Sequence, residues 1–309
     1  MNSNEFLMER LRWPQGKVNV VLDTDTYNEV DDQFALSYMV ASEDKINIKG
    51  IYAAPFQNEK ADTPALGMKK SYDEIGKILT LCGRPDLKGI TYYGSERFLT
   101  DEKTPVESDA ARDLVRLAMN CPDDSPLYVL AIGAITNVAS ALLMEPRIAE
   151  KIVVVWLGGN AHHWSDTREF NMSEDIAAAR VVMNAVLPLV QLPCMGVVTH
   201  LATTGPELRH WLKGKNALCD YLCDIVIHDE EVVRGRKLWN RAIWDVSVIA
   251  WLLNEGFMET RIVSTPLPAY DGYYSFSDNR HPMKYIYMVH RDLIFEDLFR
   301  KLAGVHTLA

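Results

Sequence analysis

Four aspartates crowd a short stretch near the start of the chain, and their spacing indicates chemistry that involves a cation. Asp23 and Asp25 follow an apolar run, and Asp31 and Asp32 come shortly after them. Because like charges at this density repel and raise each other's pKa, a fold seldom gathers them without a positive partner. Carboxylate oxygens are hard ligands that select Ca²⁺ or Mg²⁺ over softer metals. The stretch therefore predicts a site for a hard divalent cation.

Helix capping and phosphatase chemistry are the two alternatives to a cation site. Asp31 and Asp32 could place negative charge in the first turn of a helix, where the helix dipole favours it. Capping leaves the two earlier aspartates without a role. A phosphatase that forms an aspartyl-phosphate also begins with an Asp-x-Asp pair after a strand. Its motif has Thr or Val two residues after the second Asp, where this chain has Tyr27, and it has no place for the Asp31–Asp32 pair.

The aspartates lie at the end of a predicted strand, and the rest of the chain indicates the sheet to which that strand belongs. Short β-branched runs alternate with helical stretches. Strands are predicted over residues 18–22, 46–54, 127–132, 152–157, 187–191 and 285–289. Helices are predicted over residues 31–41, 66–81, 108–119, 135–144 and 173–184. Because most of these strands are apolar throughout, we expect an α/β fold: a mostly parallel, doubly wound sheet with helices on both faces.

The C-terminal half is richer in helix, and nothing in the chain marks a domain boundary. Further helices are predicted over residues 206–213, 217–228, 242–253 and 292–302. There is no long Gly/Ser/Pro linker and no internal repeat, so we predict a single domain over residues 1–309 with a helical elaboration in its C-terminal half. Ligands of doubly wound sheets bind beyond the carboxyl ends of the strands. The residues just after positions 22, 54, 132 and 157 are therefore the first candidates for a site.

Composition excludes several classes of function. The chain has 32 Lys and Arg against 42 Asp and Glu, a formal charge of −10, which argues against binding to a nucleic-acid backbone. No apolar stretch approaches the ~20 residues that span a bilayer, so no membrane partner is expected. The polar N-terminus and five scattered cysteines lack a secretory signal and a disulfide or zinc pattern. We therefore expect a cytoplasmic protein with a small-molecule substrate.

Five segments, in order, resemble the nucleoside hydrolase (inosine–uridine-preferring) family. Residues 20–32 (VVLDTDTYNEVDD) resemble its D-x-D-x-G-x-D-D fingerprint, and residues 50–58 (GIYAAPFQN) its strand that ends in a ribose-contacting Asn. Residues 130–146 resemble its G-P-L-T-N-[IV]-A stretch, and residues 156–178 its M-G-G…A-E-F-N…D-P-E-A-A block. Trp244 and Asp245 fall where the family has a late His-Asp pair. On these residues the chain is identified as a divergent member of the family.

The resemblance implies the nucleoside hydrolase fold and a function. Members are N-ribosyl hydrolases of purine and pyrimidine salvage that bind one Ca²⁺, release free base and ribose, and are commonly homo-oligomers (dimers or tetramers). The implied calcium ligands are Asp25, Asp32, Asp245 and the backbone carbonyl of Ile132, with Asp25 also the base that activates the metal-bound water. The implied sugar contacts are Asp31, Asn58, Glu169 and Asn171, with Asp23 supporting the loop from behind.

Physical chemistry supports these roles independently. A cation that holds two vicinal hydroxyls fixes a ribose, and nearby carboxylates stabilise the positive charge that develops on the sugar. Glu169 and Asn171 are two apart, so in extended backbone both would point to the same side. The alternative is an ordinary polar loop in which Asn171 or Ser173 caps the next helix. Asn137 is expected to be a helix cap rather than a substrate group.

The chain departs from the family pattern at two places. Asn28 and Glu29 are inserted into the aspartate loop, and we expect Asn28 to enter the site. Trp244 replaces a His that is proposed to protonate the leaving base, and an indole N–H cannot act as an acid. Activation must then come from another residue or from stacking on an aromatic ring. The candidates are His162, His163, Trp164 and Trp239, of which we place His163 and Trp164, together with Trp244, at the substrate site.

Two alternative functions remain open because of these departures. The chain could hydrolyse another N-ribosyl compound. It could also be a catalytically silent protein that binds ribose or a nucleoside and keeps the cation without an acid. Release of free ribose, measured with and without a chelator, separates these possibilities.

Overall fold

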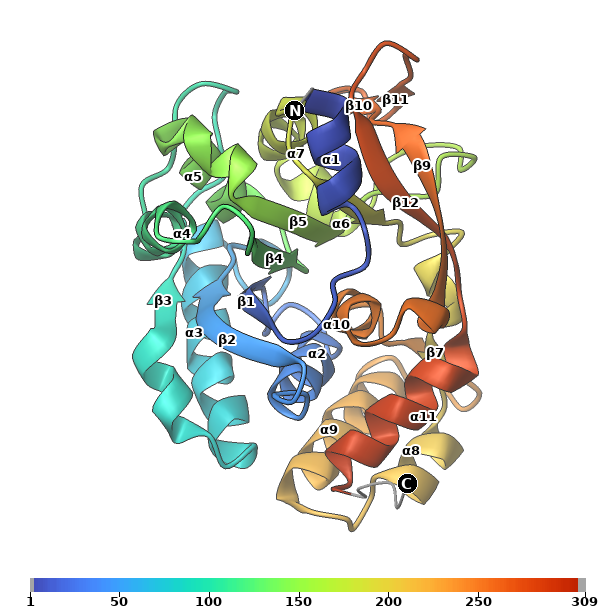
Figure 1. The fold of residues 1–309 in the computed structure, drawn as a ribbon. Helices are drawn as coiled ribbons and strands as arrows, with labels where there is room; N and C mark the ends of the chain where they lie inside the picture. Colours follow the sequence, from blue (N-terminus) through green and yellow to red (C-terminus); the bar gives the residue numbers. More distant parts are fainter. Residues whose placement is uncertain (1–2, 305–309) are drawn as a thin grey trace.

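The computed structural model describes residues 3–304, and its centre is an eight-stranded sheet (Figure 1). The strand order is β3-β2-β1-β4-β5-β6-β12-β9. Every neighbouring pair is parallel except β12 and β9, which are antiparallel. The strands are β1 (Val18–Thr24), β2 (Ile46–Ala53), β3 (Thr91–Tyr93), β4 (Leu127–Ala131), β5 (Ile152–Leu157), β6 (Leu189–Leu192), β9 (Met258–Ser264) and β12 (Pro282–Val289). This arrangement confirms the predicted α/β fold class.

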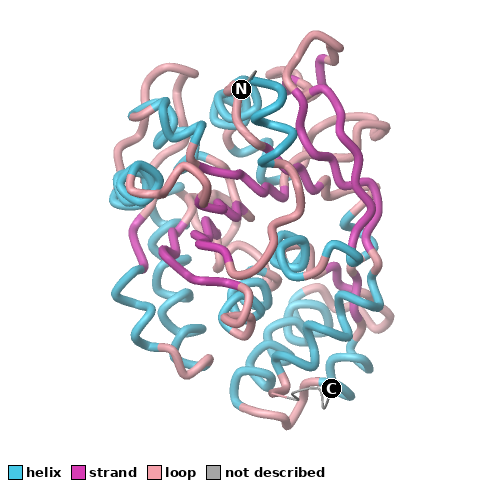
Figure 2. Tube along the Cα trace, in the orientation of Figure 1, coloured by secondary structure: helices cyan, strands magenta, loops and turns pink. Residues whose placement is uncertain are grey.

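The central strands form because they can bury both faces. Every residue of β4 and β5 is buried. Successive residues of β5 alternate between two apolar clusters: Val153 and Val155 belong to one, Val154 and Trp156 to the other. The first cluster lies under α2 (Asp32–Val40), α3 (Pro64–Leu81), α9 (Ala217–Ile227), α10 (Val246–Leu253) and α11 (Arg291–Leu302). The second lies under α4 (Asp109–Met119), α5 (Thr136–Met144) and α7 (Ile176–Asn184). Figure 2 shows these helices around the central strands.

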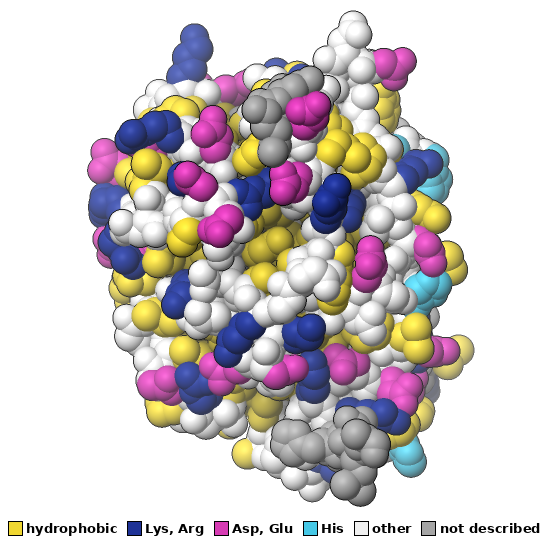
Figure 3. Space-filling model, viewed as in Figure 1, with side chains coloured by type: hydrophobic (Ala, Val, Ile, Leu, Met, Phe, Trp, Pro, Cys, Tyr) yellow, Lys and Arg dark blue, Asp and Glu magenta, His cyan; other side chains and the backbone are white. Residues whose placement is uncertain are grey.

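The C-terminal half adds helices beside the sheet. α8 (Gly205–Trp211), α9 and α11 group together at the lower side of Figure 1. After α9 the chain continues as a π-helix, His228–Val233. Short 3-10 turns complete the connections at Pro85–Ile90, Pro146–Glu150, Val198–His200 and Glu255–Phe257. On the face shown in Figure 3, acidic and basic side chains are interspersed.

Several elements that are short or exposed were not predicted from the sequence. The edge strand β9 is largely exposed and has no apolar run. β3 is only three residues long, and four further strands of two residues each are too short to show a periodic pattern. These strands form two antiparallel pairs: β7 (Ala202–Thr203) with β8 (Arg241–Ala242), and β10 (Leu267–Pro268) with β11 (Tyr274–Ser275). The first helix, α1 (Ser3–Arg10), is also unpredicted. The helix predicted over residues 173–184 is two helices, α6 (Phe170–Glu174) and α7, because Asp175 leaves helical geometry and caps α7 with its carboxylate.

None of the helices within residues 3–304 is both long enough and apolar enough to cross a membrane.

Candidate active site

A cavity of about 220 Å³ opens where β1, β4 and β5 end. Six of its lining residues are acidic, and several others are apolar or aromatic. The lining consists of Asp25, Asn28, Glu29, Asp31, Asp32, Ile132, Leu157, Glu169, Phe170, Asn171, Cys194, Met195, Trp244 and Asp245. The sheet thus brings together predicted site residues that are more than 200 positions apart in the sequence.

Three carboxyl groups form the tightest acidic group of this cavity. One oxygen from each of Asp31, Asp32 and Asp245 lies within 4.8 Å of the other two, and all three residues are buried. Asp31 and Asp32 stand at the start of α2, and Asp245 stands at the start of α10, which packs against α2. The positive ends of two helix dipoles therefore point toward the group. The partial positive charge at the two helix ends offsets only part of the negative charge of the three buried carboxylates.

Burial and mutual repulsion raise the pKa values of these aspartates, and a bound cation would stabilise their charged forms. Burial, followed by Glu29 and Asp32, raises the pKa of Asp31 to about 8. Burial raises the pKa of Asp32 to about 6, although the Thr24 hydroxyl donates to this carboxylate at 2.5 Å and opposes the rise. Burial and the neighbouring carboxylates also raise the pKa values of Asp25 and Asp245. An all-oxygen donor set of this charge fits Ca²⁺ or Mg²⁺.

These shifts predict that the cation-free protein loses stability as the pH rises. Between the ordinary aspartate pKa of 3.8 and about 8, the folded protein holds protons that the unfolded chain has released. The free energy of unfolding must then fall across this window, and a divalent cation that binds the group should restore it most strongly at the upper end. We expect the unfolding midpoint with EDTA to fall by about 5 °C or more from pH 5 to pH 8. Calorimetry at both pH values tests this, and a flat profile would contradict it.

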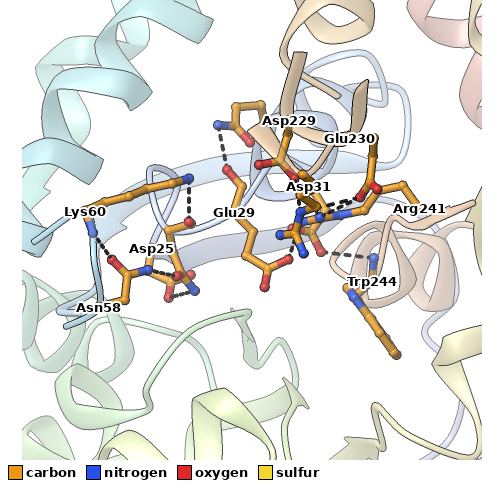
Figure 4. Close-up of polar contacts among 12 residues, drawn as sticks. Asp25, Glu29, Asp31, Asn58, Lys60, Asp229, Glu230, Arg241 and Trp244 are labelled. Atoms are coloured by element: carbon orange, nitrogen blue, oxygen red, sulfur yellow. Dashed lines mark hydrogen bonds and ion pairs between the residues drawn. The ribbon is translucent and has the colours of Figure 1, made fainter. Parts of the chain in front are cut away.

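Asp25 is oriented by a chain of amide side chains. Asn28 Nδ2 donates to Asp25 Oδ2 at 3.0 Å, and Asn58 Nδ2 donates to Asn28 Oδ1 at 2.8 Å (Figure 4). Lys60 Nζ donates to the Asn28 carbonyl oxygen at 2.8 Å. The inserted Asn28 therefore reaches the cavity. Asn58 does not line it and lies behind Asn28, so its contact with a sugar stays a prediction.

The other inserted residue, Glu29, is held by a buried arginine that no motif in the sequence singles out. Arg241 on β8 forms an ion pair with Glu29 and further pairs with Asp229 at 2.9 Å and Glu230 at 3.1 Å (Figure 4). The Arg241 side chain is 8% exposed, and the Glu230 side chain is completely buried. Arg241 thus joins the aspartate loop and the π-helix to the segment that precedes Asp245.

Removal of the buried Arg241 side chain should lower the free energy of unfolding considerably. Arg241→Met leaves Asp229 and Glu230 only the more exposed partners Arg234 at 2.8 Å and Arg236 at 3.1 Å. Breaking a buried ion pair from one side costs about 3 kcal/mol or more. The matched control is Arg209→Met, which breaks an exposed pair with Glu231 at 2.9 Å and should cost about 1 kcal/mol or less. Urea unfolding measures both. Equal losses in the two variants would argue against a special role for Arg241.

Glu169 and Asn171 both line the cavity, and both have structural partners. The Glu169 carboxylate accepts backbone N–H bonds from Gly159 at 2.8 Å, Asn171 at 2.8 Å and Met172 at 3.0 Å. The helix cap therefore falls on Glu169 and not on Asn171 or Ser173. Asn171 Nδ2 donates to the carbonyls of Ile132 at 3.2 Å and Leu157 at 3.0 Å, which ties the ends of β4 and β5 together.

Asp23 lies behind the cavity on β1. Asn137 Nδ2 donates to Asp23 Oδ1 at 2.7 Å, and Asn137 Oδ1 accepts from the backbone N–H and hydroxyl of Ser95 at 2.8 and 2.9 Å. The prediction that Asn137 caps a helix is wrong: Ile135 occupies that position, and Asn137 serves a buried carboxylate that needs a donor. Burial raises the pKa of Asp23 to about 7 despite this bond.

The predicted contacts His163 and Trp164 do not line the cavity. Both side chains lie near Gly196, and Trp164 is 42% exposed. The neighbouring His162 is enclosed by the rings of Tyr274, Phe276 and Tyr285. Burial lowers the pKa of His162 to about 4, so it is neutral at physiological pH. Substrate contacts by His163 and Trp164 stay predictions.

Trp244 does line the cavity, and its backbone N–H donates to Asp31 Oδ2 at 3.1 Å. Sequence reasoning did not select Phe170, Cys194, Met195 or the partly buried Glu174. Phe170 could have been selected from the sequence, because it stands between Glu169 and Asn171 in a segment that resembles the family pattern. Cys194 and Met195 follow β6 in a loop without any motif. Glu174 acts at a distance: its charge adds to the rise in the pKa of Asp25.

Comparison with known proteins agrees with this arrangement. Residues 20–281 match the family described as inosine-uridine preferring nucleoside hydrolase. The non-specific ribonucleoside hydrolase RihC of Salmonella enteritidis PT4 is 25% identical over 249 residues, which cover 76% of this chain and 78% of that protein. RihC of Salmonella paratyphi B is 28% identical over the same coverage.

Solved structures share the fold. A purine-preferring ribonucleoside hydrolase from Gardnerella vaginalis superposes with a TM-score of 0.71 at 18% identity, covering 93% of this chain and 98% of that one. A plant nucleoside hydrolase gives 0.70 at 16% identity, covering 94% and 100%. The type III effector XopQ, solved with adenosine diphosphate ribose, gives 0.68 at 13% identity and 98% of both chains.

By class, then, the chain is an N-ribosyl hydrolase. It belongs to the inosine-uridine preferring nucleoside hydrolase family, which confirms the resemblance found in its sequence.

Proposed function

We propose that the protein is a calcium-dependent hydrolase that cleaves the N-glycosidic bond of ribonucleosides and releases free base and ribose. The observation that carries the proposal is the buried group Asp31, Asp32 and Asp245 beside Asp25 in one cavity. No Lys, Arg or His is among the described residues that line this cavity, and the ion pair of Glu29 with Arg241, which lies outside the lining, leaves the aspartates without a cationic side chain in the cavity. A bound divalent cation would supply that charge.

The residues proposed to hold the cation are Asp25, Asp32, Asp245 and the carbonyl oxygen of Ile132. These four donors are all hard oxygens, which suits Ca²⁺. When bound, the cation would hold vicinal ribose hydroxyls and increase the acidity of water. The Ile132 carbonyl accepts one bond from Asn171 and keeps a second lone pair for this purpose.

Asp25 is proposed to accept the proton of the attacking water. Its carboxylate keeps one oxygen, Oδ2, in contact with Asn28, which fixes its direction. Asp31, Glu169 and Asn171 would bind the sugar, with Asn58 as a further sugar contact and Asp23 as support from behind. As the glycosidic bond stretches, positive charge develops on the ribosyl group. The carboxylates that line the cavity stabilise that charge more strongly than they stabilise the ground state.

The heterocyclic base is proposed to occupy the apolar part of the cavity. Leu157, Phe170, Met195 and Trp244 supply flat and flexible apolar surface for it. Stacking on Trp244 or Phe170 needs no particular hydrogen-bond pattern, so we expect purine and pyrimidine nucleosides to be accepted. His163 and Trp164 are proposed as outer contacts of the same substrate. A cytoplasmic homo-oligomer that serves nucleoside salvage fits this activity.

A second candidate is a catalytically silent protein that binds a ribose or nucleoside. It is favoured by one observation: Trp244 stands in the cavity where many family members have a histidine. Free ribose should be measured from a panel of nucleosides, first with EDTA and then with excess Ca²⁺. Ribose released only with calcium supports the hydrolase. Calcium-dependent binding of the panel without any ribose would support the silent protein.

A further inference from the structure

The cavity contains no side chain suited to protonate a leaving base. Its described lining has no histidine or lysine. Burial raises the pKa of the Cys194 thiol well above its usual range, which makes it a poor acid. The Glu29 carboxylate is ion-paired with Arg241, and the Glu169 carboxylate accepts three backbone N–H bonds. The other acidic side chains are those proposed for the cation and the sugar. A neutral base would have no proton donor and could be assisted only by stacking on Trp244 or Phe170.

The lack of a general acid affects the cleavage rates of two kinds of N-riboside differently. A neutral purine or pyrimidine leaves as an anion unless it is protonated, and a general acid is worth about 10²- to 10⁴-fold in rate. A heterocycle whose glycosidic ring already carries a positive charge leaves as a neutral molecule and needs no proton. The absence of an acid therefore slows only the first kind.

The charge of the cavity acts in the same direction. Six acidic residues line it, and no basic side chain does among the described residues; Arg241, outside the lining, pairs with one of the six, Glu29. One divalent cation compensates only part of this charge. The indole of Trp244 and the ring of Phe170 provide aromatic faces that attract a cationic ring. A cationic substrate is therefore favoured both in binding and in bond cleavage.

We propose that the preferred substrates are cationic N-ribosides, such as N-ribosyl pyridinium compounds and N7-alkylated purine ribosides. This inference rests on the proposed hydrolase function. In the reaction, the bond between C1′ and the ring nitrogen breaks and its electron pair stays on the nitrogen, which leaves a neutral base. The water oxygen forms a bond to C1′, and its proton goes to Asp25. Positive charge moves from the ring to the sugar, toward the carboxylates.

The test compares matched substrates on the calcium-loaded protein. In mildly acidic buffer, where 7-methylinosine keeps its ring N1 proton, inosine and 7-methylinosine differ in one methyl group and one positive charge. We expect kcat/KM for 7-methylinosine to exceed that for inosine by about 100-fold or more. Nicotinamide riboside should be turned over with a lower KM than nicotinic acid riboside, whose extra carboxylate the acidic cavity repels. A ratio below about 100-fold for the methylated pair, or no difference between the two pyridinium ribosides, overturns the inference.

Variants at Trp244 separate the absence of an acid from other causes. Trp244→His provides an ionisable donor and should reduce the ratio of kcat/KM between the methylated and unmethylated substrates at least about tenfold. The pH profile of kcat/KM should then show the ionisation of the imidazole. Trp244→Phe keeps an aromatic face and should keep the ratio. Calcium affinity, measured by competition with terbium luminescence, should be the same in both variants. An unchanged ratio in Trp244→His overturns the inference.

Failure of the inference differs from failure of the proposed function. If inosine is hydrolysed as well as 7-methylinosine, the enzyme assignment holds and only the substrate class is wrong. If no riboside of either kind yields ribose with calcium, the hydrolase proposal itself fails.

Discussion

Asp25→Asn is expected to lower kcat/KM for ribose release by about 10³-fold. The asparagine keeps the size of the side chain and can still accept the bond from Asn28, but it cannot take a proton from water. Asp25 also stands beside Asp32, so loss of its charge should weaken calcium binding as well. Saturating calcium in the assay separates the two effects. Initial rates of ribose release, measured over a calcium titration, provide the test.

The matched control is Asp113→Asn. Asp113 is a buried aspartate on α4 that accepts from the Tyr52 hydroxyl at 2.9 Å and pairs with Arg116, away from the cavity lining. The same chemical change there should leave ribose release within about threefold of the unmodified protein once folding is verified by circular dichroism. Comparable turnover in the Asp25 and Asp113 variants would remove Asp25 from the mechanism.

Asp245→Asn should weaken calcium binding by about 100-fold or more, because it removes one of the charges proposed to hold the ion. The same change should stabilise the protein in EDTA at pH 8, because one buried like charge disappears from beside Asp31 and Asp32. Opposite signs in the two measurements are difficult to obtain by general damage to the fold. Terbium luminescence and thermal unfolding measure them separately. Unchanged affinity would mean that Asp245 is not a ligand.

Much of the arrangement around the cavity was predictable from local signals. The central strands have apolar runs that only a doubly covered sheet can bury, and such a sheet collects the residues after its strands at one edge. Asp25, Ile132 and Leu157 therefore had to lie near one another. The placement of Asp245 needed more than local signals: it came from the resemblance of ordered segments, since no periodicity connects position 245 with position 25.

The rest depends on contacts that leave no local pattern. Arg241 is one of many arginines, and its partner Glu29 lies 212 positions away. Glu169 could cap a helix or bind a sugar, and the sequence cannot show that its carboxylate faces three backbone N–H groups. His163 and Trp164 were expected at the substrate as candidates for activation of the leaving base. Neither lines the cavity, and both side chains lie near Gly196.

The Arg241 contacts also bear on how this protein diverged from its relatives. Both inserted residues are engaged elsewhere: Asn28 with Asn58 and Asp25, and Glu29 with Arg241. Deleting the pair to recover the usual loop length would remove one of the carboxylate partners of the buried Arg241 and leave Asn58 Nδ2 without its acceptor. We therefore expect the two residues and their distant partners to be epistatic, so that loop grafting in this enzyme has to exchange them as one set.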